Sequence, residues 1–228
     1  MVEFASNGST ARGYLALPSS TPAPAVLVLQ EWWGLNPQIK GVADRLAAEG
    51  FVALSPDLYH GELAQHDEMD KAGHLMSSMP MDRAARDMSG AITYLLGHDA
   101  ASGPSVGVIG FCMGGMLSLV IAAAAGDKVG AAVPFYGAPL DPNGAPDWSG
   151  LTAPVSGHFA EVDDFFGPGP VKALEKQLQD MGKDVTFEVH AGTGHAFLNE
   201  ENPLGTYNAD EAKRAWDASV SFLHSKLG

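Results

Sequence analysis

The stretch SVGVIGFCMGG, residues 105–115, joins an apolar strand to a turn of small residues around a single cysteine. A continuous apolar run, residues 116–125, follows it and predicts a helix that is buried inside the domain. A side chain at such a strand-to-helix turn needs small neighbours, because the backbone there is strained and crowded. We therefore expect Cys112 to stand above the end of a sheet, at the amino end of a helix, where the helix dipole favours a thiolate.

Apolar runs alternate with segments of helical period on both sides of this turn, which predicts a mostly parallel sheet flanked by helices. The predicted strands are residues 25–29, 51–55, 105–109, 131–135, 154–159 and 185–189. The predicted helices are the segment from Asn36-Pro37 to about residue 50, then 62–79, 81–97, 116–125, 171–181 and 209–226. Residues 138–150 are rich in Pro and Gly and predict a loop. Because the rhythm resumes after them, we expect one α/β domain over residues 1–228.

Charge and cysteine content exclude several classes of protein. The chain has 27 acidic and 13 basic residues, a formal net charge of −14, which repels nucleic acids and anionic membrane surfaces. One cysteine excludes a disulfide within the chain. The N-terminus lacks a signal-peptide pattern, and the longest apolar run is about half the ~20 residues that span a bilayer. We expect a soluble, cytoplasmic protein with no membrane partner, either a monomer or a weak homodimer.

The order of three reactive residues predicts chemistry at the cysteine. Cys112 is followed by Asp163, just beyond one predicted strand, and by His195, just beyond another. In α/β-hydrolases the nucleophile, the acid and the histidine follow each other in this order along the chain. Sites in open α/β sheets form at the carboxyl ends of the strands. In such a triad the histidine takes the proton of the nucleophile and later protonates the leaving group, while the carboxylate orients the imidazole.

Each of these residues has a plainer interpretation. Cys112 could be a buried structural cysteine before a glycine-rich turn, and His195 an ordinary loop histidine. Asp164 adjoins Asp163 and either could be a solvated loop acid; we prefer Asp163. The spacing of the other histidines, together with the single cysteine, predicts no metal site.

A second unusual segment, QEWWG at residues 30–34, directly follows the first predicted strand. The loop at this place supplies one oxyanion donor in the α/β-hydrolase arrangement, which here is the backbone N–H of Trp32; the N–H of Met113 supplies the other. Glu31 is either a solvated charge or, if it lies near Cys112, a group that disfavours the thiolate. Trp32 and Trp33 are adjacent, so they cannot both face the same way.

Taken together, these segments resemble the dienelactone hydrolase (carboxymethylenebutenolidase) family. The shared markers are Gln30-Glu31-x-x-Gly34-x-Asn36, Pro56-Asp57-Leu58-Tyr59, Gly110-Phe111-Cys112-Met113-Gly114-Gly115, Tyr136-Gly137 and Gly194-His195-x-Phe197. The resemblance implies an α/β-hydrolase fold and a Cys–His–Asp triad that opens esters and lactones through an acyl-thioester. It implies Cys112 as nucleophile, His195 as base and then acid, Asp163 as its orienting partner, and Glu31 as the group that controls the resting thiol. No cofactor is implied.

The chain departs from the family at the arginines that hold the substrate carboxylate. Residues 62–79 contain no arginine, only Lys71, and the position four after His195 is Asn199. Because bidentate recognition of a carboxylate is lost, we expect a small neutral ester or lactone in a pocket lined by Trp33, Phe197 and Met76.

Two alternatives stay open. The same thiol could act on thioesters or phosphotriesters, because a triad does not specify the leaving group. The chain could also be a non-catalytic binding or redox-sensing module, since an isolated thiolate oxidises readily.

Overall fold

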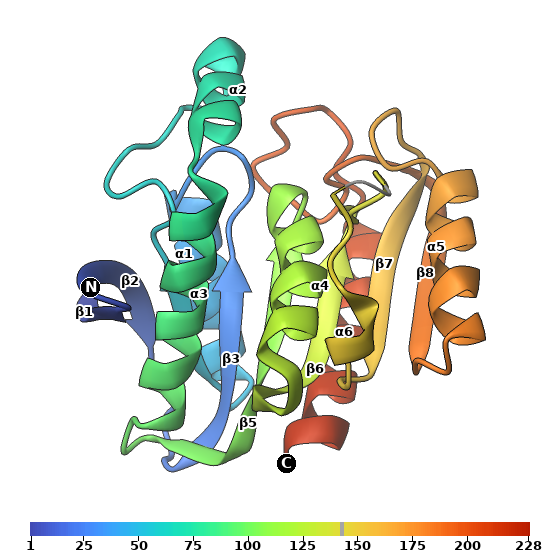
Figure 1. Ribbon diagram of the computed structural model, residues 1–228. Helices are drawn as coiled ribbons and strands as arrows, with labels where there is room; N and C mark the ends of the chain where they lie inside the picture. Colours follow the sequence, from blue (N-terminus) through green and yellow to red (C-terminus); the bar gives the residue numbers. More distant parts are fainter. Residues whose placement is uncertain (142–143) are drawn as a thin grey trace.

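The computed structural model describes residues 1–141 and 144–228 (Figure 1). Across these residues the strands form one sheet of eight, in the order β1-β2-β4-β3-β5-β6-β7-β8. The strands are β1 (Val2–Ser6), β2 (Ser9–Ala16), β3 (Ala23–Leu29), β4 (Val52–Pro56), β5 (Ala101–Phe111), β6 (Val129–Phe135), β7 (Val155–Val162) and β8 (Val185–Gly194). The α-helices are α1 (Pro37–Ala48), α2 (Met69–Ser78), α3 (Met81–Leu96), α4 (Met113–Ala125), α5 (Pro168–Asp180) and α6 (Ala209–Leu227), with 3-10 turns η1 (Gly126–Lys128) and η2 (Trp148–Gly150).

The strands from β3 to β8 are parallel, and β1 and β2 add an antiparallel edge next to β4. The chain begins the parallel part at β3, moves outward to β4, and then returns to the other side of β3 with β5. This reversal of direction lies between β3 and β5, and sites in open α/β sheets form at the carboxyl ends of the strands at such a point. The loops after β3 and β5 carry Glu31 and Cys112.

Helices cover both faces of the sheet (Figure 1). One core contains Leu27 and Leu29 of β3 and packs the sheet against α3, α4 and α5. The other core contains Val26 and Val28 of the same strand and packs it against α1 and α6. Successive side chains of β3 thus point to opposite faces and are buried on each, which explains why this strand is apolar throughout.

Local sequence signals explain several helix ends. Asn36 caps α1 as predicted, because its side chain accepts a hydrogen bond of 3.0 Å from the backbone N–H of Ile39. The helix predicted over residues 62–79 begins only at Met69, and residues 62–68 precede it as a loop. The predicted loop 138–150 ends in η2, and its residues 142 and 143 lie outside the described residues. None of the described helices has both the length and the apolar character that crossing a bilayer requires.

The sequence analysis missed the hairpin of β1 and β2. Its turn is Asn7-Gly8, with φ of 38° and 94°, and positive φ at both central residues is what a two-residue hairpin turn requires. Phe4 and Ser6 of β1 are buried, whereas Glu3 and Ala5 are exposed, so no apolar run marks this strand. The dipeptide Asn-Gly was the signal that could have predicted it.

The turn between β5 and α4 has the strained geometry that the sequence predicted. Cys112 has φ 53° and ψ −114°, and α4 begins at the next residue. Residues other than glycine rarely adopt such a φ, and keeping the backbone of one in this conformation costs about 1–3 kcal/mol. Small neighbours make the turn possible: a Cβ on Gly114 would lie 2.3 Å from the carbonyl oxygen of Leu29. The amino end of α4 therefore lies directly against the end of β3.

Replacing Gly114 by alanine should destabilise the protein strongly, because the added methyl group would meet backbone atoms that cannot move independently. We expect the free energy of unfolding in urea to fall by about 3 kcal/mol, the upper end of overpacking effects. Gly41→Ala is the matched control, since Gly41 lies in α1 with open space around its Cα. That change should stabilise by about 0.5–1 kcal/mol, and an equal effect at the two positions would contradict this account of the turn.

Candidate active site

The predicted triad residues follow the carboxyl ends of three parallel strands, β5, β7 and β8. β7 ends at Val162, directly before Asp163, and β8 ends at Gly194, directly before His195. Cys112 follows β5 in the same way. Because these strands are parallel, their carboxyl ends lie along one edge of the sheet, which brings residues far apart in the sequence together.

Asp163 holds His195 through one carboxylate oxygen. The distance from His195 Nδ1 to Asp163 Oδ2 is 2.8 Å. The other oxygen, Oδ1, accepts hydrogen bonds from the backbone N–H groups of Phe165 and Phe166, at 2.8 and 2.9 Å. Both oxygens are therefore fixed, and the imidazole carries its proton on Nδ1 and directs Nε2 away from Asp163. Asp164, the alternative acid, is exposed.

The surroundings of His195 favour its protonated form. Burial alone would lower the pKa of His195, but hydrogen bonds to Asp163 and to Cys112 raise that pKa to about 10. The pKa of Asp163 is lowered, because the hydrogen bonds from His195 and from two backbone N–H groups outweigh the effect of burial. His195 therefore links the carboxylate on one side to the sulfur on the other.

Cys112 is partly exposed, and its sulfur lies close enough to His195 to raise the pKa of that imidazole. Two phenols share its surroundings. Burial, and then the negative charge of a Cys112 thiolate, raise the pKa of Tyr59 above its usual range. The pKa of Tyr136 is raised by burial first, then by the charge of Glu31 and then by that of Cys112. Sulfur, imidazole and carboxylate thus lie in series, the order that nucleophilic catalysis requires.

Glu31 is buried beside these three side chains. Its Oε1 accepts a hydrogen bond of 3.3 Å from the hydroxyl of Tyr136, and its Oε2 accepts one of 2.9 Å from Nδ2 of Asn199. Burial raises the pKa of Glu31, and the nearby charge of His195 with these two hydrogen bonds offsets only part of that rise. Two uncharged donors, the Tyr136 hydroxyl and the Asn199 amide, and the charge of His195 therefore stabilise the ionised form of Glu31.

Tyr59 connects the two segments predicted to supply the oxyanion donors. Its hydroxyl donates to the carbonyl oxygen of Trp32 at 3.1 Å and lies 3.5 Å from the sulfur of Met113. Met113 is the first residue of α4, so its backbone N–H has no acceptor within the helix and is free for a ligand. The loop after β3 and the start of α4 are thereby held next to each other.

The family model that matches this chain is the dienelactone hydrolase family, over residues 11–227. The chain belongs to this family. A relative from Aquifex aeolicus, described as "Putative carboxymethylenebutenolidase", is 38% identical over 100% of this chain and 98% of its own length. A "Probable 2-oxo-3-(5-oxofuran-2-ylidene)propanoate lactonase" from Bradyrhizobium is 29% identical over 99% of this chain and 94% of its own length.

A solved structure supports the same assignment. The "Putative Dienelactone Hydrolase" of Klebsiella pneumoniae has a TM-score of 0.85 and 25% identity, covering 98% of this chain and 97% of that protein. The α/β-hydrolase fold that the sequence predicted is therefore confirmed. Members of the dienelactone hydrolase family are hydrolases, and so is this protein.

This hydrolase uses Asn199 where the family resemblance led us to look for an arginine. Asn199 is fully buried, and its side-chain amide is committed to Glu31. Its side-chain oxygen accepts a hydrogen bond of 3.1 Å from the backbone N–H of Glu201. Both ends of the amide are thus occupied within the protein, so it is not presented to a substrate carboxylate.

Two of the three residues predicted to line the substrate pocket are almost fully buried. Trp33 is only 2% exposed and packs between Trp32 and His66, while Phe197 is 0% exposed and packs against Tyr136. Aromatic rings next to a site gain from core burial, and these two rings lie in the core. Their contact with substrate stays a prediction. Met76 is 41% exposed on α2, and its contact with substrate stays a prediction.

Sequence reasoning missed the side chains that support the site. Tyr59 and Tyr136 appeared only as family markers, and Asn199 only as a departure from the family. Phe165 was also missed: its ring meets that of His195 edge-on at 5.1 Å, and it is 66% exposed. The signal for the two tyrosines was their position directly after or close to a strand end, the edge where the site lies.

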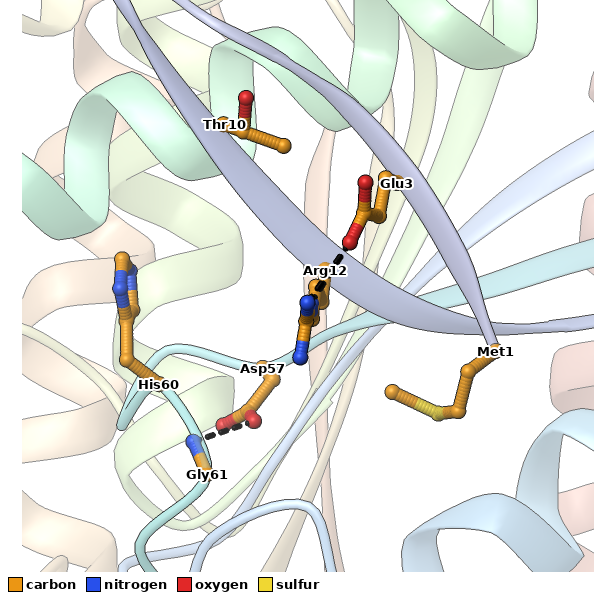
Figure 2. Close-up of a pocket in the computed structure, with 7 residues that line it drawn as sticks. All are labelled: Met1, Glu3, Thr10, Arg12, Asp57, His60 and Gly61. Atoms are coloured by element: carbon orange, nitrogen blue, oxygen red, sulfur yellow. Dashed lines mark hydrogen bonds and ion pairs between the residues drawn. The ribbon is translucent and has the colours of Figure 1, made fainter.

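A separate surface pocket lies on the antiparallel side of the sheet, between the β1–β2 hairpin and the loop that follows β4 (Figure 2). Its volume is about 510 Å³, and the residues that line it are Met1, Glu3, Thr10, Arg12, Asp57, His60 and Gly61. Its charged groups are already paired: Arg12 lies 2.8 Å from Glu3, and Asp57 accepts a hydrogen bond of 2.6 Å from the N–H of Gly61. None of these residues belongs to the triad.

The pH dependence of stability should reveal the Asp163–His195 interaction. Below about pH 6.5, His195 is protonated in both folded and unfolded chains, so its raised pKa contributes fully to stability. That contribution is lost as the pH rises toward about 10, where the folded protein also releases the proton. The stability difference between wild type and Asp163→Asn, measured by urea unfolding, should therefore be largest near pH 6 and shrink toward pH 10.

Asp164→Asn is the matched control, because it makes the same change at the exposed neighbour. It should alter stability little, within about 0.5 kcal/mol, at every pH. A difference for Asp163→Asn that stays constant from pH 6 to pH 10 would count against the raised pKa of His195.

Proposed function

We propose that this protein hydrolyses small, neutral carboxylic esters or lactones through a Cys112–His195–Asp163 triad and an acyl-thioester intermediate. The observation that carries this proposal is the series formed by these three side chains: His195 Nδ1 lies 2.8 Å from Asp163 Oδ2, and the Cys112 sulfur lies close enough to the same ring to raise its pKa. Family membership supports hydrolysis, and this series supports the particular nucleophile.

In the first half of the reaction, the Cys112 sulfur attacks the carbonyl carbon of the substrate as a thiolate, while the proton of the thiol is held on Nε2 of His195. Negative charge develops on the carbonyl oxygen, where the backbone N–H groups of Trp32 and Met113 would donate hydrogen bonds. The intermediate collapses to an acyl-thioester, and His195 gives the proton to the departing alkoxide. For a lactone, the leaving hydroxyl stays attached to the acyl group.

In the second half, water replaces the alcohol. His195 removes a proton from the water, whose oxygen attacks the thioester carbonyl, and the sulfur leaves as the acid product forms. The sulfur leaves as a thiolate beside the protonated His195, so the resting pair is restored without a cofactor. Asp163 stabilises the imidazolium in both halves and keeps the proton on Nδ1 in place.

Glu31 is proposed to control the protonation of the resting thiol, as the resemblance implies. Glu31 and Cys112 both interact with His195, so a negative charge on one competes with a negative charge on the other for the same imidazolium. A substrate that changed the burial of Glu31 would therefore change the charge state at the sulfur. Asn199 and Tyr136 fix the carboxylate in the position where this coupling operates.

The preference for a neutral substrate follows from the charges near the sulfur. Two carboxyl groups, Glu31 and Asp163, are buried there, and the net charge of the chain is −14. A carboxylate on the substrate would add to this negative field. Lys71, the basic residue of the segment 62–79, lies 3.7 Å from Glu68 on the surface and is already paired.

Removing the sulfur should abolish the reaction. We expect Cys112→Ala to lower kcat for p-nitrophenyl acetate and for simple lactones by about 10³-fold or more, because nucleophile and base act as a unit. His195→Gln should have a similar effect. Asp164→Asn is the control and should retain wild-type turnover, and far-UV circular dichroism should confirm that each variant is folded. Undiminished turnover by Cys112→Ala would overturn the proposed mechanism.

The substrate class can be tested with paired compounds. A neutral lactone or ester and its analogue with an added carboxylate should differ in kcat/KM by at least about 10-fold in favour of the neutral compound, equivalent to ~1.4 kcal/mol. High salt should reduce the difference, because it screens the long-range part of the repulsion. Preference for the carboxylate-bearing compound would show that the substrate class is wrong while leaving the triad intact.

A further inference from the structure

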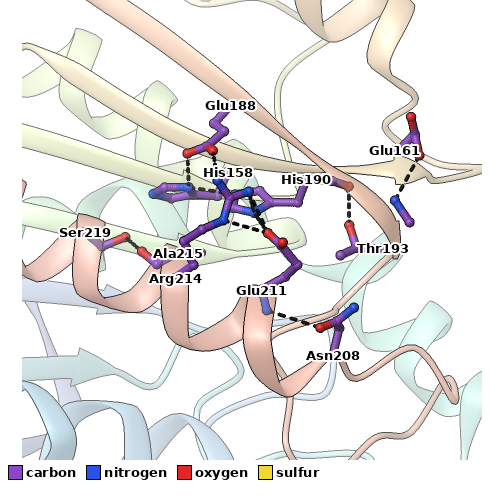
Figure 3. Close-up of polar contacts among 11 residues, drawn as sticks. His158, Glu161, Glu188, His190, Thr193, Asn208, Glu211, Arg214, Ala215 and Ser219 are labelled. Atoms are coloured by element: carbon purple, nitrogen blue, oxygen red, sulfur yellow. Dashed lines mark hydrogen bonds and ion pairs between the residues drawn. The ribbon is translucent and has the colours of Figure 1, made fainter.

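Two histidines and a glutamate meet on the face of the sheet that is covered by α6 (Figure 3). The parallel register of β7 and β8 pairs His158 with Glu188 directly. His190 follows two residues after Glu188, so it points to the same face of β8. No metal site was expected from the spacing of the histidines and the single cysteine. These three residues lie on two separate strands, so the sequence shows no local ligand spacing.

The nitrogen and oxygen atoms of this cluster converge. His158 Nδ1 lies 3.0 Å from His190 Nε2 and 3.9 Å from Oε2 of Glu188. One atom from each of the three residues lies within 4.8 Å of the others. His158 and His190 are 1% and 0% exposed, whereas the Glu188 side chain is 41% exposed. The cluster is therefore rigid on two sides and open to solvent through Glu188.

The hydrogen bonds around the cluster leave a lone pair directed into it. Nδ1 of His190 lies 2.7 Å from Oε2 of Glu211 on α6, so in the neutral ring the proton stands on Nδ1 and Nε2 offers a lone pair. His158 is 1% exposed, and burial of this kind disfavours the charged form of an imidazole. His158 Nε2 is buried and has no hydrogen-bond partner among the described residues. The proton of His158 can therefore move from Nδ1 to Nε2 without breaking a hydrogen bond at Nε2.

We propose that His158 Nδ1, His190 Nε2 and Glu188 Oε2 form a binding site for a divalent transition metal of the zinc type, with water as a fourth ligand. Two neutral imidazoles and one carboxylate are a ligand set that zinc takes in proteins. Binding needs no net loss of a proton, because the His158 proton moves from Nδ1 to Nε2.

The surrounding residues have the features of an outer ligand shell. Glu211 accepts the proton of the ligating His190, the carboxylate–histidine arrangement that raises ligand basicity and fixes ring orientation. Arg214 lies 2.7 Å from Oε1 of Glu188, which leaves Oε2 for the metal. Two carboxylates and one guanidinium give the cluster a charge of about −1, which favours a cation. With metal–nitrogen distances of ~2.0–2.1 Å, the two ring nitrogens would separate to about 3.3 Å.

The place of the cluster in the fold indicates a structural role. It joins β7 to β8, the strands that end directly before Asp163 and His195. The backbone oxygen of His158 also accepts a hydrogen bond of 2.7 Å from the N–H of Tyr136, which contacts Glu31. A metal here would cross-link the two strands that set the position of the acid and the base.

Titration of the chelator-treated protein with Zn²⁺ and Co²⁺ tests the proposal. We use full-length Cys112→Ser, because the triad thiol could itself bind these ions. We expect one equivalent of metal to bind, with visible d–d absorption bands for Co²⁺ that lack a thiolate charge-transfer band. At a metal concentration of 100 times Kd, Tm should rise by about 5 °C or more.

Variants locate the site. In the same background, Glu188→Gln and His190→Asn should each weaken metal binding at least 10-fold and remove the Tm shift; Glu188→Gln lies on the open side and leaves both buried rings in place. His66→Ala is the control, because His66 forms a comparable contact of 3.2 Å with Glu201 away from the cluster. Stoichiometric binding lost in Glu188→Gln and kept in His66→Ala supports the site. The absence of binding, or binding that Glu188→Gln leaves unchanged, overturns it.

Discussion

The structure depends on one strained residue at the end of β5. Cys112 keeps its unfavourable φ of 53° because β3 and β6 lie close on either side: its backbone N–H donates to the carbonyl of Phe135 at 3.0 Å, and the helix that follows touches the carbonyl of Leu29. The glycines around the turn are therefore a requirement of packing. This constraint lifts the sulfur above the sheet and places it at the amino end of α4, where chemistry can occur.

The polar groups around the sulfur are coupled to one another. His195 interacts with Asp163, Cys112 and Glu31, and two tyrosine hydroxyls and the amide of Asn199 complete the network. In a buried site the cost of each charge depends on the charges of the others, so these groups titrate as a set. Asn199 gives Glu31 a neutral hydrogen-bonding partner at the position where the family resemblance implies an arginine.

The sequence predicted the parallel sheet, the order of the triad and the exposed turn, because each depends on local patterning or on the rule that parallel strands end at one edge. Asp163 could be preferred to Asp164 only weakly, since adjacent loop acids differ in burial and hydrogen bonding, which patterning does not reveal. The same limit explains why patterning does not reveal that Trp33 and Phe197 are buried in the core. The pairing of His158 with Glu188 depends on the register of two strands, which the sequence leaves open.

In the proposed mechanism, the Cys112 sulfur becomes covalently bound to the acyl group during each turnover. Rapid-quench peptide mass spectrometry of the wild-type protein with p-nitrophenyl acetate measures this most directly. We predict an acetyl group on the peptide that contains Cys112, formed within the first turnover and lost at the rate of steady-state hydrolysis. Full turnover with no adduct at that peptide, or with an adduct on another residue, would contradict the account.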